Sequence, residues 1–279
     1  MVIVNRDRCT ACGTCVHICH EHCMTLVDDE VQIDYQVCST CTQCIAVCPQ
    51  QALSWDGVPP LPFDPDRLPA PEQMDELFKQ RRSIRRYKEE KVDRKLLEDI
   101  VRYGAYAPSH SHRLRVIIVD DVEAIDLLDR VLLRYIRRIY NAFFRYGVMS
   151  TLAGLIGYSR EHALAKPKLV TALDRGQAFR HPPAILFIVG SKRYALQEAS
   201  AYCLLANVTY VAQTKGVGSC LWANGPMVID KSRQARLRLG IERGERIYGA
   251  VLLGYPAVRF RNKVEGRTLD VSWCGGEAG

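Results

Sequence analysis

Hydrophobic residues recur along the chain at spacings typical of helices. Apolar positions three and four residues apart predict two amphipathic helices, one capped by Asp93 and running to about Tyr106, and a longer one from Glu123 to Tyr146. A short helix is predicted over Asp75–Gln80. The residues expected on the buried faces of the two main helices are Leu96, Leu97, Ile100 and Val101, and Ile125, Leu128, Leu132, Ile136, Ile139 and Phe143.

Short continuous apolar runs predict the strands. These runs are Val116–Val119, Ala184–Val189 and Tyr248–Gly254, and a longer run over Ala195–Lys215 predicts a buried helix. The region between the long helix and Pro183 is expected to be a loop. Strands separated by helices, without a regular strand–helix–strand rhythm, indicate an α+β domain.

A proline-rich stretch divides the chain. Six prolines lie from Val58 to Pro71, a density that opposes helix formation and favours an extended, stiff connection. We therefore predict a small module at residues 1–57, a linker at 58–72 and a larger domain at 73–279. With 279 residues, 48% of them apolar, the chain is long enough for one full-sized core beside the module.

Charge is divided unevenly between these parts. Residues 1–55 hold two arginines and six acidic residues, a net charge of −4. Since the whole chain has a net charge of +7, the remainder carries +11. An acidic module can dock on a basic body or attract a basic partner. The arginines are dispersed and no nucleic-acid-binding signature accompanies them, so nucleic acid is not an expected partner. No apolar run is long enough for a membrane span and no secretory segment precedes Cys9, so we expect a cytoplasmic protein.

Eight cysteines in the first fifty residues form two copies of one pattern. The spacing C-x2-C-x2-C-x3-C is the ligand run of bacterial ferredoxins, in which three thiolates bind one cluster and the fourth binds the other. The copies are 29 residues apart, and the second is followed by Pro49. The spacing predicts two [4Fe-4S] clusters, the first held by Cys9, Cys12, Cys15 and Cys48 and the second by Cys38, Cys41, Cys44 and Cys19.

Two residues depart from this repeat. His20 stands where the first run should carry a proline, and Cys23 is an additional cysteine four residues after Cys19. Cys23 is either an alternative ligand or a small buried apolar residue, and we favour the second interpretation because Cys19 matches Cys48 in the repeat. Zinc and disulfides are weaker interpretations, since zinc sites pair two knuckles across a longer gap and a reducing compartment disfavours disulfides. The module is too small for a large apolar core, so metal ligation should supply much of its folding free energy.

Four arginines and a serine lie within residues 81–87, directly after the predicted short helix. The planar arginine fork matches phosphate oxygens, and serine adds a neutral donor. Taken alone, the segment is better explained as a solvated basic turn. Three motifs further along the chain change that interpretation.

These motifs together resemble those of the nitroreductase family of flavin enzymes, in particular its members with an N-terminal ferredoxin module. The resemblance extends from Asp75 to Arg267. The motifs are R-R-S-x-R at Arg81, Arg82, Ser83 and Arg85; A-P-S at Ala107, Pro108 and Ser109; G-x-G-S-C at Gly216, Gly218, Ser219 and Cys220; and G-Y-P at Gly254, Tyr255 and Pro256, followed by Arg259, Arg261 and Lys263.

The resemblance implies bound FMN in an α+β fold with a nitroreductase-like mixed sheet. The FMN phosphate and ribityl chain would be held by Arg81, Arg82, Ser83 and Arg85, with help from Arg259 and Arg261. Backbone N–H groups after the G-x-G-S-C motif, near Leu221, Trp222, Ala223 and Asn224, would stabilise negative charge on the reduced ring. The other implied FMN contacts are Pro108, Ser109, Ser219, Cys220, Leu221, Ala223 and Asn224. A homodimer with both flavin sites at the subunit interface is also implied.

The loop after the A-P-S motif departs from the family pattern. The family usually continues with asparagine and then Q-P-W, whereas this chain has His110, Ser111 and His112 followed by Arg113. His112 is a candidate FMN contact and proton donor, and a surface loop residue is the alternative of equal weight. No side chain has to act as a nucleophile, because the flavin performs the chemistry.

These features predict an oxidoreductase in which two clusters pass electrons singly to FMN, which reduces an organic acceptor. The acceptor would be a nitro compound, a quinone or an activated alkene, and the external donor a ferredoxin or NAD(P)H. Two alternatives remain open. In one, NAD(P)H reduces the flavin and the clusters export electrons; in the other, the chain is a non-catalytic electron carrier or redox sensor.

Overall fold

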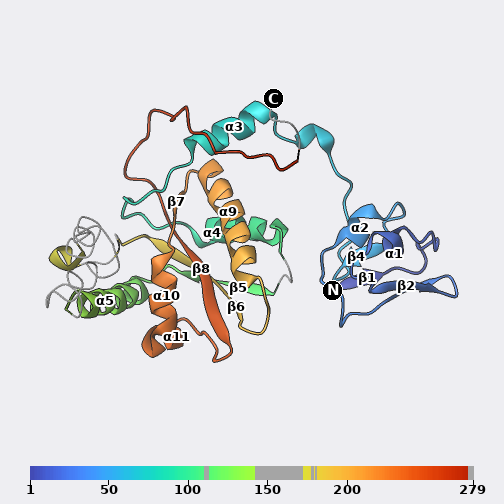
Figure 1. Cartoon of the computed structure of the whole chain (residues 1–279), viewed down its shortest axis with the longest axis horizontal. Coiled ribbons are helices and arrows are strands. Elements are labelled where there is room, and N and C mark those ends of the chain that lie inside the picture. The colour runs from blue at the N-terminus through green and yellow to red at the C-terminus, as the bar shows by residue number, and fades with distance from the viewer. Residues whose placement is uncertain (110–112, 142–171, 177–178, 180, 276–279) are drawn as a thin grey trace.

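The computed structural model describes residues 1–109, 113–141, 172–176, 179 and 181–275 (Figure 1). Its larger domain is built on a four-stranded sheet in the order β5-β6-β8-β7. The strands are β5 (Leu114–Val119), β6 (Ala184–Ser191), β7 (Gly218–Leu221) and β8 (Glu245–Gly254). Neighbouring strands are antiparallel. An isolated parallel bridge between Ser83 and Ser219, at β7, makes the sheet mixed. The predicted α+β class with a mixed sheet is confirmed.

Helices cover both faces of this sheet (Figure 1). One face is covered by α5 (Val122–Ile139), α10 (Asn224–Lys231) and α11 (Arg233–Arg238), and the other by α4 (Arg94–Arg102) and α9 (Gln197–Thr214). The first seven residues of β6 are all buried. Such a continuous buried run is typical of a strand with helices on both sides.

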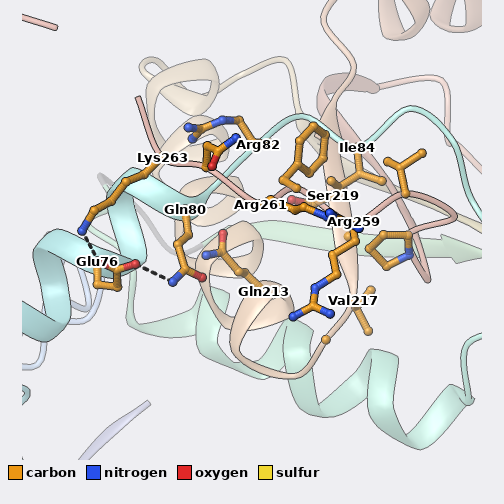
Figure 2. Close-up of a pocket in the computed structure, with 16 residues that line it drawn as sticks. Glu76, Gln80, Arg82, Ile84, Gln213, Val217, Ser219, Arg259, Arg261 and Lys263 are labelled. Atoms are coloured by element: carbon orange, nitrogen blue, oxygen red, sulfur yellow. Dashed lines mark hydrogen bonds and ion pairs between the residues drawn. The ribbon is translucent and has the colours of Figure 1, made fainter. Parts of the chain in front are cut away.

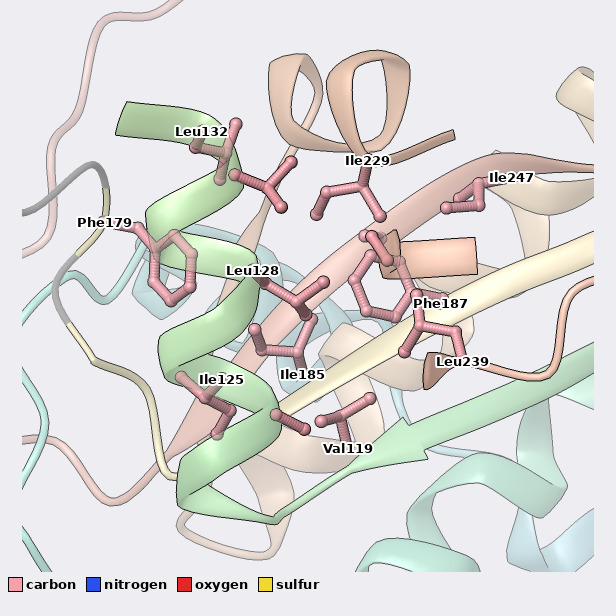
Figure 3. Close-up of a cluster of buried hydrophobic side chains, with 14 of the residues drawn as sticks. Val119, Ile125, Leu128, Leu132, Phe179, Ile185, Phe187, Ile229, Leu239 and Ile247 are labelled. Atoms are coloured by element: carbon pink, nitrogen blue, oxygen red, sulfur yellow. The ribbon is translucent and has the colours of Figure 1, made fainter. Parts of the chain in front are cut away.

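Side chains that alternate along β6 form two separate cores. Ile185 and Phe187 pack with Leu128 of α5 and Ile229 of α10 (Figure 3). The opposite core contains Leu186 and Ile188 of β6, Leu97 and Ile100 of α4, and Leu205 and Val208 of α9. Burial of each large aliphatic side chain contributes about 1.5–3 kcal/mol. The two cores therefore fix the sheet on which the candidate site is built.

The helices predicted from periodicity are present with different ends. Asp93 caps α4 by accepting a hydrogen bond from the Leu96 N–H, as predicted, but α4 ends at Arg102 and a 3₁₀ turn, η2 (Tyr103–Tyr106), follows it. The part of the second helix predicted beyond residue 141 lies outside the described residues. Residues 172–175 are helical, so the prediction of a loop up to Pro183 is wrong there. The alanine and leucine of that segment are good helix formers.

Helical turns also occur among the linker prolines. The helix predicted to begin at Asp75 is longer: α3 spans Pro71–Gln80, because proline is favourable in the first turn of a helix. Within the predicted linker, η1 (Pro65–Arg67) is a 3₁₀ turn that likewise begins with proline. Prolines therefore start helical turns here, although proline is unfavourable in the interior of a helix.

The N-terminal module repeats in structure as it does in sequence. α1 (Thr14–Ile18) and α2 (Gln43–Val47) begin 29 residues apart, and so do β2 (Met24–Val27) and β4 (Leu53–Trp55). β1 (Val2–Val4) pairs with β4, and β2 pairs with β3 (Glu30–Ile33), both antiparallel. The buried core is small and includes two cysteines: it contains Val2, Cys15, Cys23, Met24 and Leu53.

Candidate functional site: a cationic pocket and two thiol-lined hollows

Motifs that are far apart in the sequence meet at the outer edge of β7. Ser83 forms a parallel bridge with Ser219, and the Ile84 N–H donates to the Ser219 carbonyl oxygen at 2.9 Å. Residues 86–88 then pair with residues 255–257 through backbone hydrogen bonds of 2.8 and 2.9 Å. The R-R-S-x-R, G-x-G-S-C and G-Y-P motifs are thus joined by backbone contacts.

Two glycines allow this close approach. Gly216 has a φ of +73° and ends α9, where its N–H and the next one bond to the carbonyls of Gln213 and Ala212. Glycine favours this Schellman arrangement because it adopts positive φ without strain. Gly218 lies directly against Ile84 and leaves no space for a side chain. The G-x-G pair therefore ends a helix and admits the basic segment to the edge of β7.

A pocket of about 590 Å³ lies beside this junction (Figure 2). Its walls come from α3, the end of α9, the start of β7 and residues 256–263. The charged side chains that line it are Arg82, Arg259, Arg261, Lys263 and Glu76. Buried Ser219 adds a hydroxyl group. An excess of cationic donors in an open pocket suits an anion with several oxygens, such as a phosphate.

The pocket contains some, but not all, of the residues assigned to FMN by the resemblance. Those that line it are Arg82, Ser219, Arg259 and Arg261. Those that do not line it are Arg81, Ser83, Arg85, Pro108, Ser109, Cys220, Leu221, Ala223 and Asn224. Ser83 and Cys220 nevertheless lie at the β7 junction, next to lining residues. His112 lies outside the described residues.

Arg82 is anchored at the C-terminal end of α3. Its Nη1 donates to the carbonyl oxygens of Lys79 and Arg81 at 2.5 and 2.9 Å. Carbonyls at the end of a helix lack partners within the helix, and a cation there complements the helix dipole. These two bonds use one of the three guanidinium nitrogens, so the anchoring fixes Arg82 without occupying its whole donor fork.

Glu76, Gln80 and Lys263 form a hydrogen-bonded chain on one wall (Figure 2). Lys263 Nζ lies 2.7 Å from Glu76 Oε2, and Gln80 Nε2 lies 2.6 Å from Glu76 Oε1. These hydrogen bonds, first that from Gln80 and then that from Lys263, lower the pKa of Glu76 and keep it ionised at neutral pH. Because Glu76 offsets the charge of Lys263, the net positive charge of the pocket comes from its three arginines.

Five polar lining residues are not among the site residues predicted from the sequence: Glu76, Gln80, Gln213, Asn262 and Lys263. Gln213 donates from Nε2 to the Leu77 carbonyl at 3.2 Å and so joins α9 to α3. The sequence carried a signal for Lys263 alone, since it follows the G-Y-P motif. The placement of Glu76, Gln80 and Gln213 depends on how α3 packs against α9, which no local pattern encodes.

One backbone N–H group of the segment after the G-x-G-S-C motif is already bonded within the sheet. The Trp222 N–H donates to the Ala250 carbonyl at 2.9 Å, so this amide is not available to a flavin. The Trp222 ring packs against Phe179 and Phe187, with centroid distances of 5.0 and 6.1 Å. Burial raises the pKa of Tyr87 far above its ordinary value, so this hydroxyl does not exchange protons near neutral pH. Both aromatic residues therefore act in packing.

The cysteines of the module surround two separate hollows. The first is lined by Cys9, Cys12, Cys15 and Cys48, and the second by Cys19, Cys38, Cys41 and Cys44 together with Cys23. Each hollow thus combines three thiols from one run with the fourth from the other. Positions with positive φ follow the same repeat. Ala11 and Gly13 in the first half correspond to Thr40 and Thr42 in the second, and all four have positive φ.

The thiols of these hollows differ in acidity. Burial raises the pKa of Cys15 and raises that of Cys44 to about 11, whereas hydrogen bonding with Thr14 lowers that of exposed Cys12. The buried thiols are therefore protonated at neutral pH when they are free, and metal binding must displace their protons.

Each hollow is lined by at least four cysteine thiols. In the part of the chain that the structure describes, no three His, Cys, Asp or Glu side chains converge closely enough to hold one metal ion. A four-iron cube presents a different iron to each thiolate, so it needs thiols spread around a hollow. A tetrahedral zinc site needs four ligands around one centre. The residues present fit the cubes that the spacing predicts.

Among the described residues, no helix is both long enough and apolar enough to cross a membrane.

The N-terminal module can be compared with a known protein by sequence. The pyruvate synthase subunit PorD of Methanothermobacter marburgensis is 34% identical to this chain over 53 residues, which cover 19% of this chain and 62% of that subunit. The chain therefore spans less than two thirds of the length of this relative.

The larger domain resembles solved structures of flavin enzymes. A nitroreductase with bound FMN from Desulfitobacterium hafniense has a TM-score of 0.54 and 18% identity, and the match covers 71% of this chain and 97% of that one. A nitroreductase with bound FMN from Bacteroides fragilis has a TM-score of 0.50 and 20% identity, and the match covers 72% of this chain and 98% of that one. At such identities the likeness shows a shared fold. Residues 78–255 match the profile of the Nitroreductase family. Since this match covers more than half of the chain, the chain belongs to the nitroreductase family and is an oxidoreductase.

Proposed function

We propose that the chain is an iron-sulfur flavoprotein that passes electrons from two [4Fe-4S] clusters to FMN for the reduction of an organic acceptor. The observation that carries this proposal is the presence, in one chain, of a cationic pocket on a nitroreductase fold and of two thiol-lined hollows. The acceptor would be a nitro compound, a quinone or an activated alkene.

The cationic pocket supports FMN as the flavin. Two solved nitroreductases with this fold contain bound FMN, and the FMN phosphate needs the kind of donors that Arg82, Arg259 and Arg261 provide. Ser219 would add a neutral donor. The other residues that the resemblance assigns to FMN are proposed as further contacts, with both flavin sites at the interface of a homodimer. These residues are Arg81, Ser83, Arg85, Pro108, Ser109, His112, Cys220, Leu221, Ala223 and Asn224.

The two hollows support the iron-sulfur clusters. Cys9, Cys12, Cys15 and Cys48 would hold the first cluster, and Cys38, Cys41, Cys44 and Cys19 the second. When bound, clusters and flavin together supply the conversion of single electrons into two-electron chemistry. The chain's own residues hold these groups in place, limit the access of water and tune the potentials. Thiolate ligands persist in a reducing compartment, so we place the protein in the cytoplasm.

Anaerobic purification followed by quantification of iron, sulfide and flavin tests this proposal. The expected result is one FMN and about eight irons per chain, from two four-iron clusters. Cys48→Ala should lower the iron content to about four per chain or less, whereas Cys203→Ala, a thiol outside both hollows, should leave it unchanged. Zinc in place of iron, or no flavin after reconstitution, would overturn the assignment.

Anaerobic mixing then tests the direction of electron flow. Reduced ferredoxin should bleach the flavin, and a nitroaromatic, a quinone or an activated alkene should restore its colour. Bleaching by NADPH but not by ferredoxin would contradict the proposed direction. A reduced flavin that none of the three acceptor classes reoxidises would contradict the catalytic role.

A further inference from the structure

The two hollows of the module provide an internal comparison, because the 29-residue repeat relates their linings. Cys38, Cys41 and Cys44 correspond to Cys9, Cys12 and Cys15, and Cys19 corresponds to Cys48. The apolar lining follows the same rule, since Met24 corresponds to Leu53 and Val2 to Val31. Among the thiols, one has no counterpart. Cys23 lines the second hollow at the position that Ala52 occupies in the first.

Cys23 and Ala52 both lie beside the fourth cysteine of a hollow. Ala52 is 1% exposed, and its N–H donates to Cys48 Sγ at 3.3 Å. Cys23 is 6% exposed, and its Sγ lies 3.4 Å from Cys19 Sγ, within hydrogen-bonding distance for sulfur. The second hollow therefore has a side-chain group next to its fourth thiol where the first hollow has only a methyl group.

We propose that Cys23 is not a cluster ligand and that its thiol donates a hydrogen bond to Cys19, raising the reduction potential of the second cluster. This inference rests on the proposed cluster assignment. A thiolate bound to iron has lost its proton, so in the Cys19–Cys23 pair only Cys23 can be the donor. A cubane takes four thiolates, and the repeat already supplies four.

The expected effect on the potential follows from charge. Reduction adds one electron to the cluster and neither forms nor breaks a bond, so the reduced cluster is more negative by one charge. A donor aimed at a ligand sulfur stabilises this added charge, and hydrogen bonds to sulfur are among the factors that set cluster potentials. Cys23 would therefore make the second cluster easier to reduce than it would be with alanine at this position.

Cys23→Ala gives the second hollow the residue that the first already has, which makes it the natural test. The experiment is an anaerobic redox titration of the full chain followed by EPR, with iron quantified in parallel. Iron should stay at about eight per chain. One of the two midpoint potentials should fall, while the other stays unchanged. Cys23→Ser keeps a hydroxyl donor and should leave the potential closer to that of the unmodified protein.

Ala52→Cys is the reciprocal variant, because it places the same thiol in the first hollow. It should raise the potential that Cys23→Ala leaves unchanged. Loss of iron in both Cys23 variants would make Cys23 a ligand or an assembly residue and would overturn the proposal, as would full iron content with unchanged potentials in Cys23→Ala. Absence of iron from the unmodified chain would instead refute the cluster assignment itself, so the two failures are distinguishable.

Discussion

Gly218 packs against Ile84 so closely that a Cβ atom added to Gly218 would lie 2.7 Å from Ile84 Cγ1 and 3.0 Å from its Cβ. Ile84 is 7% exposed, and its N–H is bonded to the residue that follows Gly218. The basic segment therefore reaches the edge of β7 only because this position has no side chain.

Gly218→Ala should push that segment away from β7. We expect the free energy of unfolding to fall by about 1–3 kcal/mol, the usual cost of overpacking, and FMN to dissociate more readily. Denaturant unfolding and flavin fluorescence measure the two effects. Gly244→Ala is the matched control, because nothing lies within 4 Å of its added Cβ atom. Equal behaviour of the two variants would show that the contact has no role.

The arginines of the pocket should govern FMN affinity. Loss of a hydrogen bond to a charged group costs about 1.5–3 kcal/mol, so Arg259→Ala or Arg261→Ala should weaken FMN binding roughly 10- to 100-fold. The loss should shrink at high salt, because both arginines are exposed. Flavin release measured by ultrafiltration tests this. Arg267→Ala changes an exposed arginine of the same C-terminal segment that does not line the pocket and should have no effect.

The ion pair between Arg115 and Glu245 should make the stability of the sheet depend on pH. Two hydrogen bonds of 2.8 and 2.6 Å join the side chains, and Glu245 is 16% exposed. The pairing lowers the pKa of Glu245 in the folded state. Its stabilisation is therefore fully present above the unfolded value of about 4.3 and is lost as the pH falls through the folded value.

Glu245→Gln should consequently reduce the free energy of unfolding by about 1–2 kcal/mol at pH 7, since part of the pair is solvent-screened. The difference from the unmodified chain should narrow as the pH approaches 3. Urea titrations at both pH values provide the measurement. Glu89→Gln, at an exposed glutamate, is the control. A difference that grows in acid would have the wrong sign for this pair.

Removal of iron should unfold the module and spare the larger domain. The buried residues of the module are four apolar residues and two cysteines, so cluster binding must supply much of its stability. After anaerobic chelation, proteases should cut within residues 1–57, while the sheet domain should persist as a resistant fragment. A module that stays resistant without iron would show that its apolar core suffices.

Sequence patterns located the elements whose signals are local. Asp93 marks the start of α4 because its carboxylate caps the helix, and β6 was found because helices on both faces demand an unbroken apolar run. The four-residue β7 escaped prediction because it begins with glycine and serine, which disfavour strands in isolation. Its conformation is imposed by pairing with β8.

In the candidate site, too, some residues have a local sequence signal and others are placed only by tertiary packing. The motif arginines Arg82, Arg259 and Arg261 were predicted because their chemistry is visible in the sequence, and they do line one pocket. Gln213 and Glu76 reach that pocket only through the packing of α3 against α9, so no spacing rule identifies them. The sequence shows Cys23 as a departure from the repeat, whereas its closeness to Cys19 depends on how the module folds.

The position of β7 at the end of the strand order has a consequence beyond cofactor binding. An uncovered outer strand offers its backbone groups as a template for another chain and invites aggregation. Here the R-R-S-x-R segment itself covers part of that strand, through the hydrogen bond from the Ile84 N–H to the Ser219 carbonyl oxygen. Changes that free this segment from the sheet should therefore lower solubility as well as flavin content.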